Sequence, residues 1–476
     1  MQHAPKALVI TGFILFAAFN IATAQHSPMP WLDEVAYADP AGNYYFQGLF
    51  QSSLWAAAGR PFWVGNVPLH QFILIILCKV FGFSIYLVRG VSVIYYSAAV
   101  MLLLRTIKHT SLIQSARMRF FAVIMAFSAT GCVAIYRNGR YDALGFLLAS
   151  IAVATAFRSR QSRKSELLLF ASCALIPWAG LQVIPFFGMC TLFYLGMLGK
   201  AGWRGFLLGN GGLLIGIILL LLFYASLGQL DNFIRALHSQ GHVWQDMRLA
   251  VMMNPTYLAL VGIGVSAGIF NWKYSFLEST NRIKVAHALV FIGLVTPWVM
   301  HFVSKYTIYY TWMATIPALI GVAIMYENCA LTAVRRAALV LVILSAIPGY
   351  PRRLLSIASG NDMKRQLEIQ EFINKNVSSD DKTMLDMECL YAYYSTRTRS
   401  RTLNFDLPEN EELNRQSTCI VANVTNCESE YKARIGGDWK CTTTLPANIT
   451  PRNKLWDLIL GKPQAENNSL VIYHRL

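Results

Sequence analysis

A series of long apolar runs between residues 7 and 349 constrains the fold of this chain more than any other feature. The runs are continuous rather than alternating, and several could carry a helix across a hydrocarbon layer roughly 30 Å thick. Only helices and closed barrels span a bilayer, because every backbone polar group must be satisfied there. The sequence therefore predicts an all-α polytopic membrane protein.

Composition and charge agree with this class. The chain is 55% hydrophobic and 14% charged, whereas a soluble domain has roughly 25% charged residues. The net charge of +16 could indicate a nucleic-acid partner. Lys and Arg concentrate in short loops between apolar runs, however, as the positive-inside rule predicts for cytoplasmic loops. We therefore expect no nucleic-acid partner and place the basic loops 105–119 and 158–164 in the cytoplasm.

The first apolar segment, residues 7–24, directs the following chain outward. It ends in Ala22-Thr23-Ala24, which resembles a signal-peptidase site, so a cleaved signal peptide is the alternative to a retained helix. In both cases residue 25 emerges on the outer face.

Loop charge then fixes the number of crossings. If 105–119 is cytoplasmic, only one of the stretches 67–83 and 85–104 crosses the membrane. The stretch 67–83 is short and contains Pro68, so we interpret it as an interfacial or half-inserted helix. It would belong to an outer loop at 25–85. Eleven crossings are expected in total, at 7–24, 86–104, 119–136, 142–157, 166–180, 183–199, 205–225, 255–270, 285–302, 310–326 and 333–349.

The composition becomes polar at about residue 350. Residues 351–381 predict a linker followed by a helix, and KTMLDM, RTLNF, CIVANV and LVIYH predict short strands, with YAYYSTR helical between the first two. We therefore expect a transmembrane catalytic domain at 1–349 and a small α/β domain at 350–476. An odd number of crossings would put this second domain on the outer face.

Four cysteines lie in this polar region: Cys389, Cys419, Cys427 and Cys441. Their spacing contains no CxxC pair, which argues against a zinc site, and cysteines of an exported domain more often form disulfides. Three connectivities are open.

An acidic and aromatic stretch follows the first apolar segment directly: WLDEVAYADPAGNYYFQGLFQSSLW, residues 31–55. It holds the adjacent carboxylates Asp33 and Glu34. Removing a carboxylate from water costs free energy, so acids this close to a membrane indicate a functional role.

The predicted topology places a set of polar and charged residues on the same outer face. An acid can accept a proton from an attacking hydroxyl while Arg and Lys stabilise a departing phosphate, so the set suits group transfer from a phosphate-linked donor. An apolar groove between helices would hold a lipid tail. The candidates are Asp33, Glu34, Tyr37, His70, Lys79, Arg89, Arg137, Arg140, Asp142 and Lys305.

Each candidate also has an interpretation without function. Asp33 and Glu34 could be loop residues or cap the next helix, and Asp142 could cap the helix after it. Arg89 could extend to the interface, where His70 could also lie. Arg137 and Arg140 could belong to a turn, and Lys305 to an aromatic interfacial belt.

At these residues the sequence resembles the dolichyl-phosphate-mannose–protein mannosyltransferases and the bacterial lipid A aminoarabinose transferases, which are GT-C type membrane glycosyltransferases. The acidic pair after the first helix is one part of the resemblance. GNVPLHQFILIILCKVFGFSIYLVRGVSVI is similar to a family pattern of Pro-Pro-Leu, Lys-x-Phe-Gly and a helix-opening Arg, with Val67 in place of the first Pro.

Two later segments extend the resemblance. GRYDALGFLLASIAVATAF is similar to the family's Arg-x-Asp-Ala-Leu motif, and SKYTIYYTWMATIPALIGVA more loosely to a late segment of Lys, Tyr and Pro. Residues 350–476 do not match the β-trefoil of the eukaryotic enzymes, which favours the bacterial branch.

The resemblance implies a polyprenyl-phosphate sugar donor, transfer with inversion to a lipid, glycan or protein acceptor, and an uncleaved first helix. It implies that Asp33 is the base or orients the acceptor, with Glu34 its neighbour, and that Arg89 and Asp142 are motif residues. It also implies an active site and C-terminal domain facing the periplasm from a bacterial inner membrane, or the lumen of the endoplasmic reticulum in a eukaryote.

Our hypothesis is a glycosyltransferase in which Asp33 takes the proton of an acceptor hydroxyl and Arg89 steadies the released phosphate. No cofactor is expected. Asp33, Glu34, Asp142 and His70 could converge on a divalent metal, but their spacing does not require one. A transporter or flippase of a lipid-linked sugar is the rival, although the chain shows no clear repeat and its acids lie in loops. A structural subunit, whose acids would be dispensable, is the third class.

Overall fold

The computed structural model describes residues 6–28, 32–50, 67–157, 162–239, 281–302, 308–328, 346–359, 361–378, 380–385, 415–424, 435–446 and 469–476, with single positions at 30, 336, 340, 343 and 389. Within them the chain divides into two compact units. The first comprises residues 1–15, 94–136 and 141–351, and the second residues 16–93, 137–140 and 352–476.

The first apolar segments form helices close to the expected bounds. They are α1 (Lys6–Ala22), α2 (Leu32–Gln47), α3 (Pro68–Phe81), α4 (Ile85–His109), α5 (Ala116–Ser128), α6 (Thr130–Arg137), α7 (Asp142–Ala156), α8 (Arg163–Ala179) and α9 (Val183–Leu198). The expected outer-loop helix at 67–83 is α3, which opens with Pro68 as a helix N-terminus tolerates.

Later helices follow the same pattern. They are α10 (Trp203–Ser226), α11 (Leu230–Ser239), α14 (Asn281–Phe302), α15 (Trp312–Asn328), α17 (Tyr350–Ser359) and α18 (Asn361–Asn376), with single 3₁₀ turns at Gly199–Gly202 and Ile308–Tyr310. The expected crossing at 255–270 lies outside the described residues, as does most of 333–349.

Among the described residues, three helices are long and apolar enough to cross a membrane: α4, α10 and the Arg282–Met300 part of α14. The pair α5 and α6 adds a fourth if it counts as one bent span. Shorter apolar helices at α1, α3, α7, α9 and α15 fall below this length. The expected number of eleven crossings is not confirmed.

The expected continuous crossing at 119–136 is broken, because α5 and α6 meet at an angle of 62°. Two tyrosines explain the break. Tyr96 donates its hydroxyl to the Ala126 carbonyl at 2.6 Å, and Tyr136 donates to the Phe127 carbonyl at 2.8 Å. These side chains satisfy carbonyls that an uninterrupted helix would bond to its own amides.

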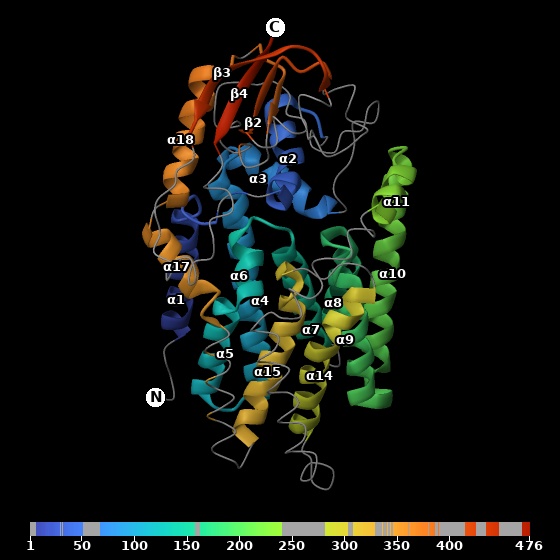
Figure 1. Cartoon of the computed structure of the whole chain (residues 1–476). Coiled ribbons are helices and arrows are strands. Elements are labelled where there is room, and N and C mark those ends of the chain that lie inside the picture. Colours follow the sequence, from blue (N-terminus) through green and yellow to red (C-terminus); the bar gives the residue numbers. More distant parts are fainter. Residues whose placement is uncertain are drawn as a thin grey trace. The chain divides into compact units, whose positions relative to one another are not determined.

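The helices of the first unit that lie alongside one another in Figure 1, from α7 to α10 with α14 and α15, pack through small residues. Gly293 of α14 faces α15, where an added Cβ atom would lie 2.7 Å from the Ala318 Cβ atom and 2.8 Å from the Ala314 oxygen. In the same way Gly216 of α10 lies directly against the Ala174 backbone of α8. Close approach at small residues is how helices associate where lipid removes the hydrophobic drive.

The second unit includes a four-stranded sheet: β1 (Thr383–Leu385), β2 (Cys419–Asn423), β3 (Trp439–Leu445) and β4 (Leu470–Arg475), in the order β1-β2-β4-β3. The pair β1–β2 is parallel and the other two pairs are antiparallel. One face packs on α18 through Ile369, Phe372 and Ile373. A small α/β fold was expected here. The RTLNF strand and the YAYYSTR helix lie outside the described residues.

Three expectations for this region need correction. The segment 350–359, expected as a linker, is the helix α17. The strand β3 was not expected, because most of its side chains are polar and solvent-facing and it shows no apolar pattern. Cys389, Cys419 and Cys441 carry no disulfide. The first two are buried in the domain core, and Cys427 lies outside the described residues.

The α14–α15 contact gives a direct test of the packing. Replacing Gly293 by Ala should lower the stability of the detergent-solubilised protein by about 1–3 kcal/mol, because the added methyl group overlaps α15. Gly188 in α9 has no atom within 4 Å of its added Cβ position, so Gly188→Ala is the matched control and should be neutral or mildly stabilising. Thermal unfolding of both variants measures the difference, and equal midpoints would contradict the packing.

Candidate active site

The acidic pair lies in the first turn of α2, where the helix dipole favours negative charge. Of the two acids, the structure describes the side chain of Glu34. It is fully buried. For Asp33 it describes only the backbone, which is helical.

Glu34 and Arg89 form a buried ion pair in the second unit. Arg89 Nε lies 2.7 Å from Glu34 Oε1, and Arg89 Nη2 lies 2.7 Å from Glu34 Oε2, a bidentate geometry. The exposed fraction is 1% for Arg89 and 0% for Glu34. Such a pair is strong because a planar guanidinium matches both carboxylate oxygens at once.

Arg89 also anchors the chain between α1 and α2. Its Nη1 atom donates to the Ala24 carbonyl at 2.6 Å and to the Pro28 carbonyl at 2.7 Å. The guanidinium therefore joins α4, α2 and the intervening turn. The interpretation of Arg89 as a side chain that extends to the interface is wrong, because its side chain is buried.

Arg137 holds the same turn from a different side. Its guanidinium donates to the Ser27 carbonyl at 2.6 Å, the Thr23 carbonyl at 2.9 Å and the Asn20 carbonyl at 3.0 Å. It also reaches the side-chain oxygens of Asn20 and Thr23. Several carbonyl groups of residues 20–28 thus accept hydrogen bonds from Arg89 and Arg137.

Gly139 closes the site next to Glu34. Its φ of +60° is a left-handed conformation that favours glycine. An added Cβ atom would lie 2.8 Å from Val88 Cγ1 and 3.1 Å from Glu34 Oε1. The RNGRYD motif (residues 137–142) therefore needs glycine at this position for two independent reasons. No role was expected for this glycine from the sequence. The Asn138-Gly139 dipeptide, which is typical of turns, was the signal that could have indicated one.

His70 and Arg140 lie beside this glycine and are both buried. Burial lowers the pKa of His70, a residue of the short helix α3, to about 4, while the Arg140 charge adds to the shift and a hydrogen bond with the Gly139 backbone opposes it. His70 is therefore neutral at pH 7. The Arg140 guanidinium lies 5.6 Å from the Tyr37 ring centre, and its carbonyl accepts a hydrogen bond from Ser92 at 2.9 Å.

The structure thus brings together Glu34, Tyr37, His70, Arg89 and Arg140 around Gly139. Lys79 lies in the last turn of α3 and contacts α2 instead: its Nζ atom is 3.4 Å from the Tyr44 hydroxyl and 4.9 Å from the Tyr44 ring centre. Asp142 is fully buried as the first residue of α7, in the first unit. It does not occupy the capping position, which belongs to Tyr141. Lys305 lies outside the described residues.

One further buried acid was not singled out from the sequence. Asp39, in the middle of α2, is fully buried, and its Oδ2 atom accepts a hydrogen bond from Asn43 at 3.3 Å. Its i, i+4 spacing from Asn43 was the available signal.

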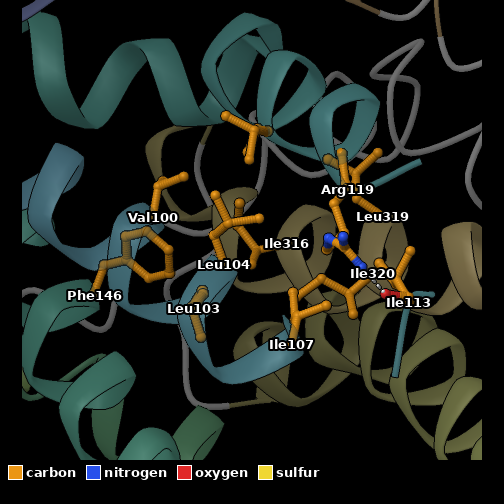
Figure 2. Close-up of a pocket in the computed structure, with 13 residues that line it drawn as sticks. Val100, Leu103, Leu104, Ile107, Ile113, Arg119, Phe146, Ile316, Leu319 and Ile320 are labelled. Carbon is orange, nitrogen blue, oxygen red and sulfur yellow. Dashed lines mark hydrogen bonds between the residues drawn. The ribbon is translucent and has the colours of Figure 1, made fainter. Parts of the chain in front are cut away.

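The first unit contains an apolar pocket between α4, α5, α7 and α15 (Figure 2). Its cavity volume is about 30 Å³, room for one or two water molecules and not for a lipid tail. Arg119 is the charged side chain in its lining, and this side chain donates to the Ile113 and Gln114 carbonyls at 2.7 Å each. This pocket has the shape of a packing gap between helices.

A scan against protein-family models finds no match, and a comparison with curated protein sequences finds none. Solved structures do match. The chain is similar to ArnT from Cupriavidus metallidurans bound to undecaprenyl phosphate, with a TM-score of 0.58 and 12% identity over 98% of each chain. It is also similar to the arabinofuranosyltransferase AftD from Mycobacteria, with a TM-score of 0.53 and 11% identity over 98% of this chain and 40% of AftD.

Both structures are GT-C glycosyltransferases, and ArnT is a lipid A aminoarabinose transferase. The likeness spans nearly the whole chain rather than one group of helices. It confirms the resemblance found in the sequence, and the predicted helical membrane architecture agrees with it. The chain therefore has a fold similar to that of ArnT and of AftD.

Proposed function

We propose that the protein is a GT-C type glycosyltransferase that moves a sugar from a polyprenyl-phosphate donor to an acceptor hydroxyl. Two observations support this proposal. The fold matches ArnT, whose structure holds undecaprenyl phosphate. The first helix after α1 carries an acidic pair, and one acid of that pair is fixed by a buried arginine.

The Glu34–Arg89 pair is the observation that carries the assignment of roles. Both oxygens of Glu34 bind Arg89, so Glu34 is a positioning residue in this proposal rather than a proton acceptor. Asp39 is buried and bonded to Asn43. We therefore assign the base to Asp33, and Asp142 of the first unit stays a second catalytic candidate from the sequence.

In the proposed reaction the acceptor oxygen attacks the anomeric carbon of the donor sugar. Its proton passes to the Asp33 carboxylate, a new carbon–oxygen bond forms, and the bond between that carbon and the phosphate oxygen breaks. The released product is the polyprenyl phosphate. A single displacement of this kind inverts the configuration at the sugar.

The departing phosphate must be stabilised by cationic side chains. Arg89 and Arg137 donate to Glu34 and to the carbonyl groups of residues 20–28, so we assign them to holding the site together. The proposal leaves Arg140, Lys79 and Lys305 to contact the phosphate, with Tyr37 stacked beneath Arg140. Neutral His70 would serve as a hydrogen-bonding group.

We also propose a cellular location for the site. The site and the domain at 350–476 would face the periplasm of a bacterial inner membrane, or the lumen of the endoplasmic reticulum in a eukaryote. The acceptor would be a lipid, a glycan or a protein that reaches the outer surface.

Asp33→Asn tests the base assignment. In membranes supplied with radiolabelled polyprenyl-phosphate sugars, this variant should lose about 10²–10⁴-fold in transfer rate, because the amide cannot take the hydroxyl proton. Asp231→Asn is the matched control, since Asp231 is an exposed acid in the first turn of α11, and it should keep full activity.

Two results would contradict this account in different ways. Normal transfer by Asp33→Asn at normal expression would remove the base assignment alone. No transfer by the unmutated protein from any such donor, together with movement of the lipid-linked sugar across vesicles, would favour the transporter.

Removing one partner of the Glu34–Arg89 pair should destabilise the protein strongly. Glu34→Gln or Arg89→Met should cost about 3–5 kcal/mol, because each leaves a buried charge uncompensated. The Glu34→Gln, Arg89→Met double variant should cost less than the sum of the two. Thermal unfolding in detergent measures these values.

The pair between Glu166 and Arg204 is the matched control. Its nitrogen–oxygen distance is also 2.7 Å, but Arg204 is 77% exposed. Arg204→Met should therefore change stability by less than about 1 kcal/mol. Equal losses for the buried and exposed pairs would contradict the role of Glu34 as a positioning residue.

A further inference from the structure

Three residues with metal-binding side chains lie side by side in the C-terminal sheet. Cys419 begins β2, and the strand register places it directly opposite His474 of β4. On its other side Cys419 pairs with Thr383 at the start of β1, and Asp381 lies two residues before that strand. The strand order β1-β2-β4 therefore brings an acid, a thiol and an imidazole into one row.

The distances within this row suit a single ion. One ligand atom from each of Asp381, Cys419 and His474 lies within 4.8 Å of the other two. His474 Nε2 is 3.5 Å from Asp381 Oδ2. Tetrahedral zinc with bonds of about 2.0–2.3 Å keeps its ligand atoms about 3.3–3.8 Å apart, so closure needs shifts of at most about 1.5 Å.

Neighbouring groups hold the imidazole in a defined tautomer. The Thr442 hydroxyl donates its proton to the Ile472 carbonyl at 3.1 Å, and its oxygen lies 3.1 Å from His474 Nδ1. Nδ1 must then be the donor to Thr442, because the hydroxyl has one proton. In the neutral imidazole Nε2 then carries the lone pair that faces the Asp381 carboxylate, so both atoms are placed to bind one cation.

Hydrogen bonds also fix the orientation of the Asp381 carboxylate. Asp381 Oδ2 accepts a hydrogen bond from the Ser378 amide at 2.8 Å, and Oδ1 accepts one from the Thr418 hydroxyl at 3.1 Å. Hydrogen bonds that orient ligands in this way are characteristic of built metal sites.

The donor atoms explain which ion fits. When a metal binds, the sulfur–metal bond forms and the thiol proton leaves to solvent. A mixed sulfur, nitrogen and oxygen donor set suits a borderline divalent ion, above all Zn²⁺.

We propose that Asp381, Cys419 and His474 bind one Zn²⁺ ion, which joins the ends of β1, β2 and β4 in the C-terminal domain. His474 is about one-third exposed, so the fourth position opens to solvent. The ion stabilises the domain and uses none of the residues proposed for sugar transfer. A pattern of CxxC pairs could not reveal this site, because Cys419 and His474 come from two different strands and Asp381 from the segment before a third.

Cobalt titration of the full-length protein in detergent tests the proposal, since Co²⁺ replaces Zn²⁺ and reports on sulfur ligation. The unmutated protein should bind one Co²⁺ per chain with a near-ultraviolet thiolate-to-cobalt absorption band, and Zn²⁺ should displace it. Zn²⁺ should also raise the unfolding temperature.

Cys419→Ala and Asp381→Asn should both lose the band and the thermal shift. Asp381→Asn covers the case in which the buried Cys419 position does not tolerate substitution. Cys441→Ser is the matched control, because Cys441 is an exposed cysteine of the same sheet, and it should keep both signals.

Three results would overturn the proposal. One is the absence of a thiolate band in the unmutated protein. That result would mean that His474 and Asp381 pair directly with each other and bind no metal. The second is a band that persists in Asp381→Asn and Cys419→Ala. The third is loss of the band in Cys441→Ser.

Discussion

The structure depends on one buried interaction, the bidentate ion pair between Glu34 of α2 and Arg89 of α4. Removing two charges from water is costly, and the cost is recovered only when geometry is good and the remaining donors are satisfied. Arg89 meets both conditions, because its other contacts are the carbonyl groups of Ala24 and Pro28. The pair joins the first turn of α2 to the first turns of α4, and Gly139 fits against Glu34 where no larger residue could.

This arrangement separates the two adjacent acids into different proposed roles. Glu34 is committed to Arg89, so it sets the orientation of the helix turn that carries its neighbour. Asp33 is left as the acid for proton transfer in the proposed reaction. By the same reasoning Arg89 and Arg137 hold the site together instead of binding phosphate. Phosphate binding is then assigned to Arg140, Lys79 and Lys305. A fold similar to that of ArnT over nearly the whole chain gives this assignment its context.

Much of the fold followed from the sequence, because long apolar runs determine where helices begin and end. The expected segments 183–199 and 205–225 differ from α9 and α10 by at most two residues at each end. The break between α5 and α6 could not be predicted, since it depends on hydroxyl groups of Tyr96 and Tyr136 that meet only in the folded chain. The Asp381–Cys419–His474 cluster was missed for the same reason, and β3 was missed because its exposed polar side chains show no apolar pattern. At the candidate site Glu34 and Arg89 were both candidates, but their ion pair and the carbonyl partners of Arg89 could not be predicted, because these contacts also form only in the folded chain.

The central claim is a single displacement at the sugar, with Asp33 as base and polyprenyl phosphate as leaving group. Nuclear magnetic resonance of the purified product, compared with the donor, measures the configuration at the anomeric carbon most directly. The account predicts that the configuration is inverted in the transferred sugar. Retention of the donor configuration would contradict it, because retention requires a second displacement and therefore a covalent or equivalent intermediate that Asp33 as a simple base does not provide.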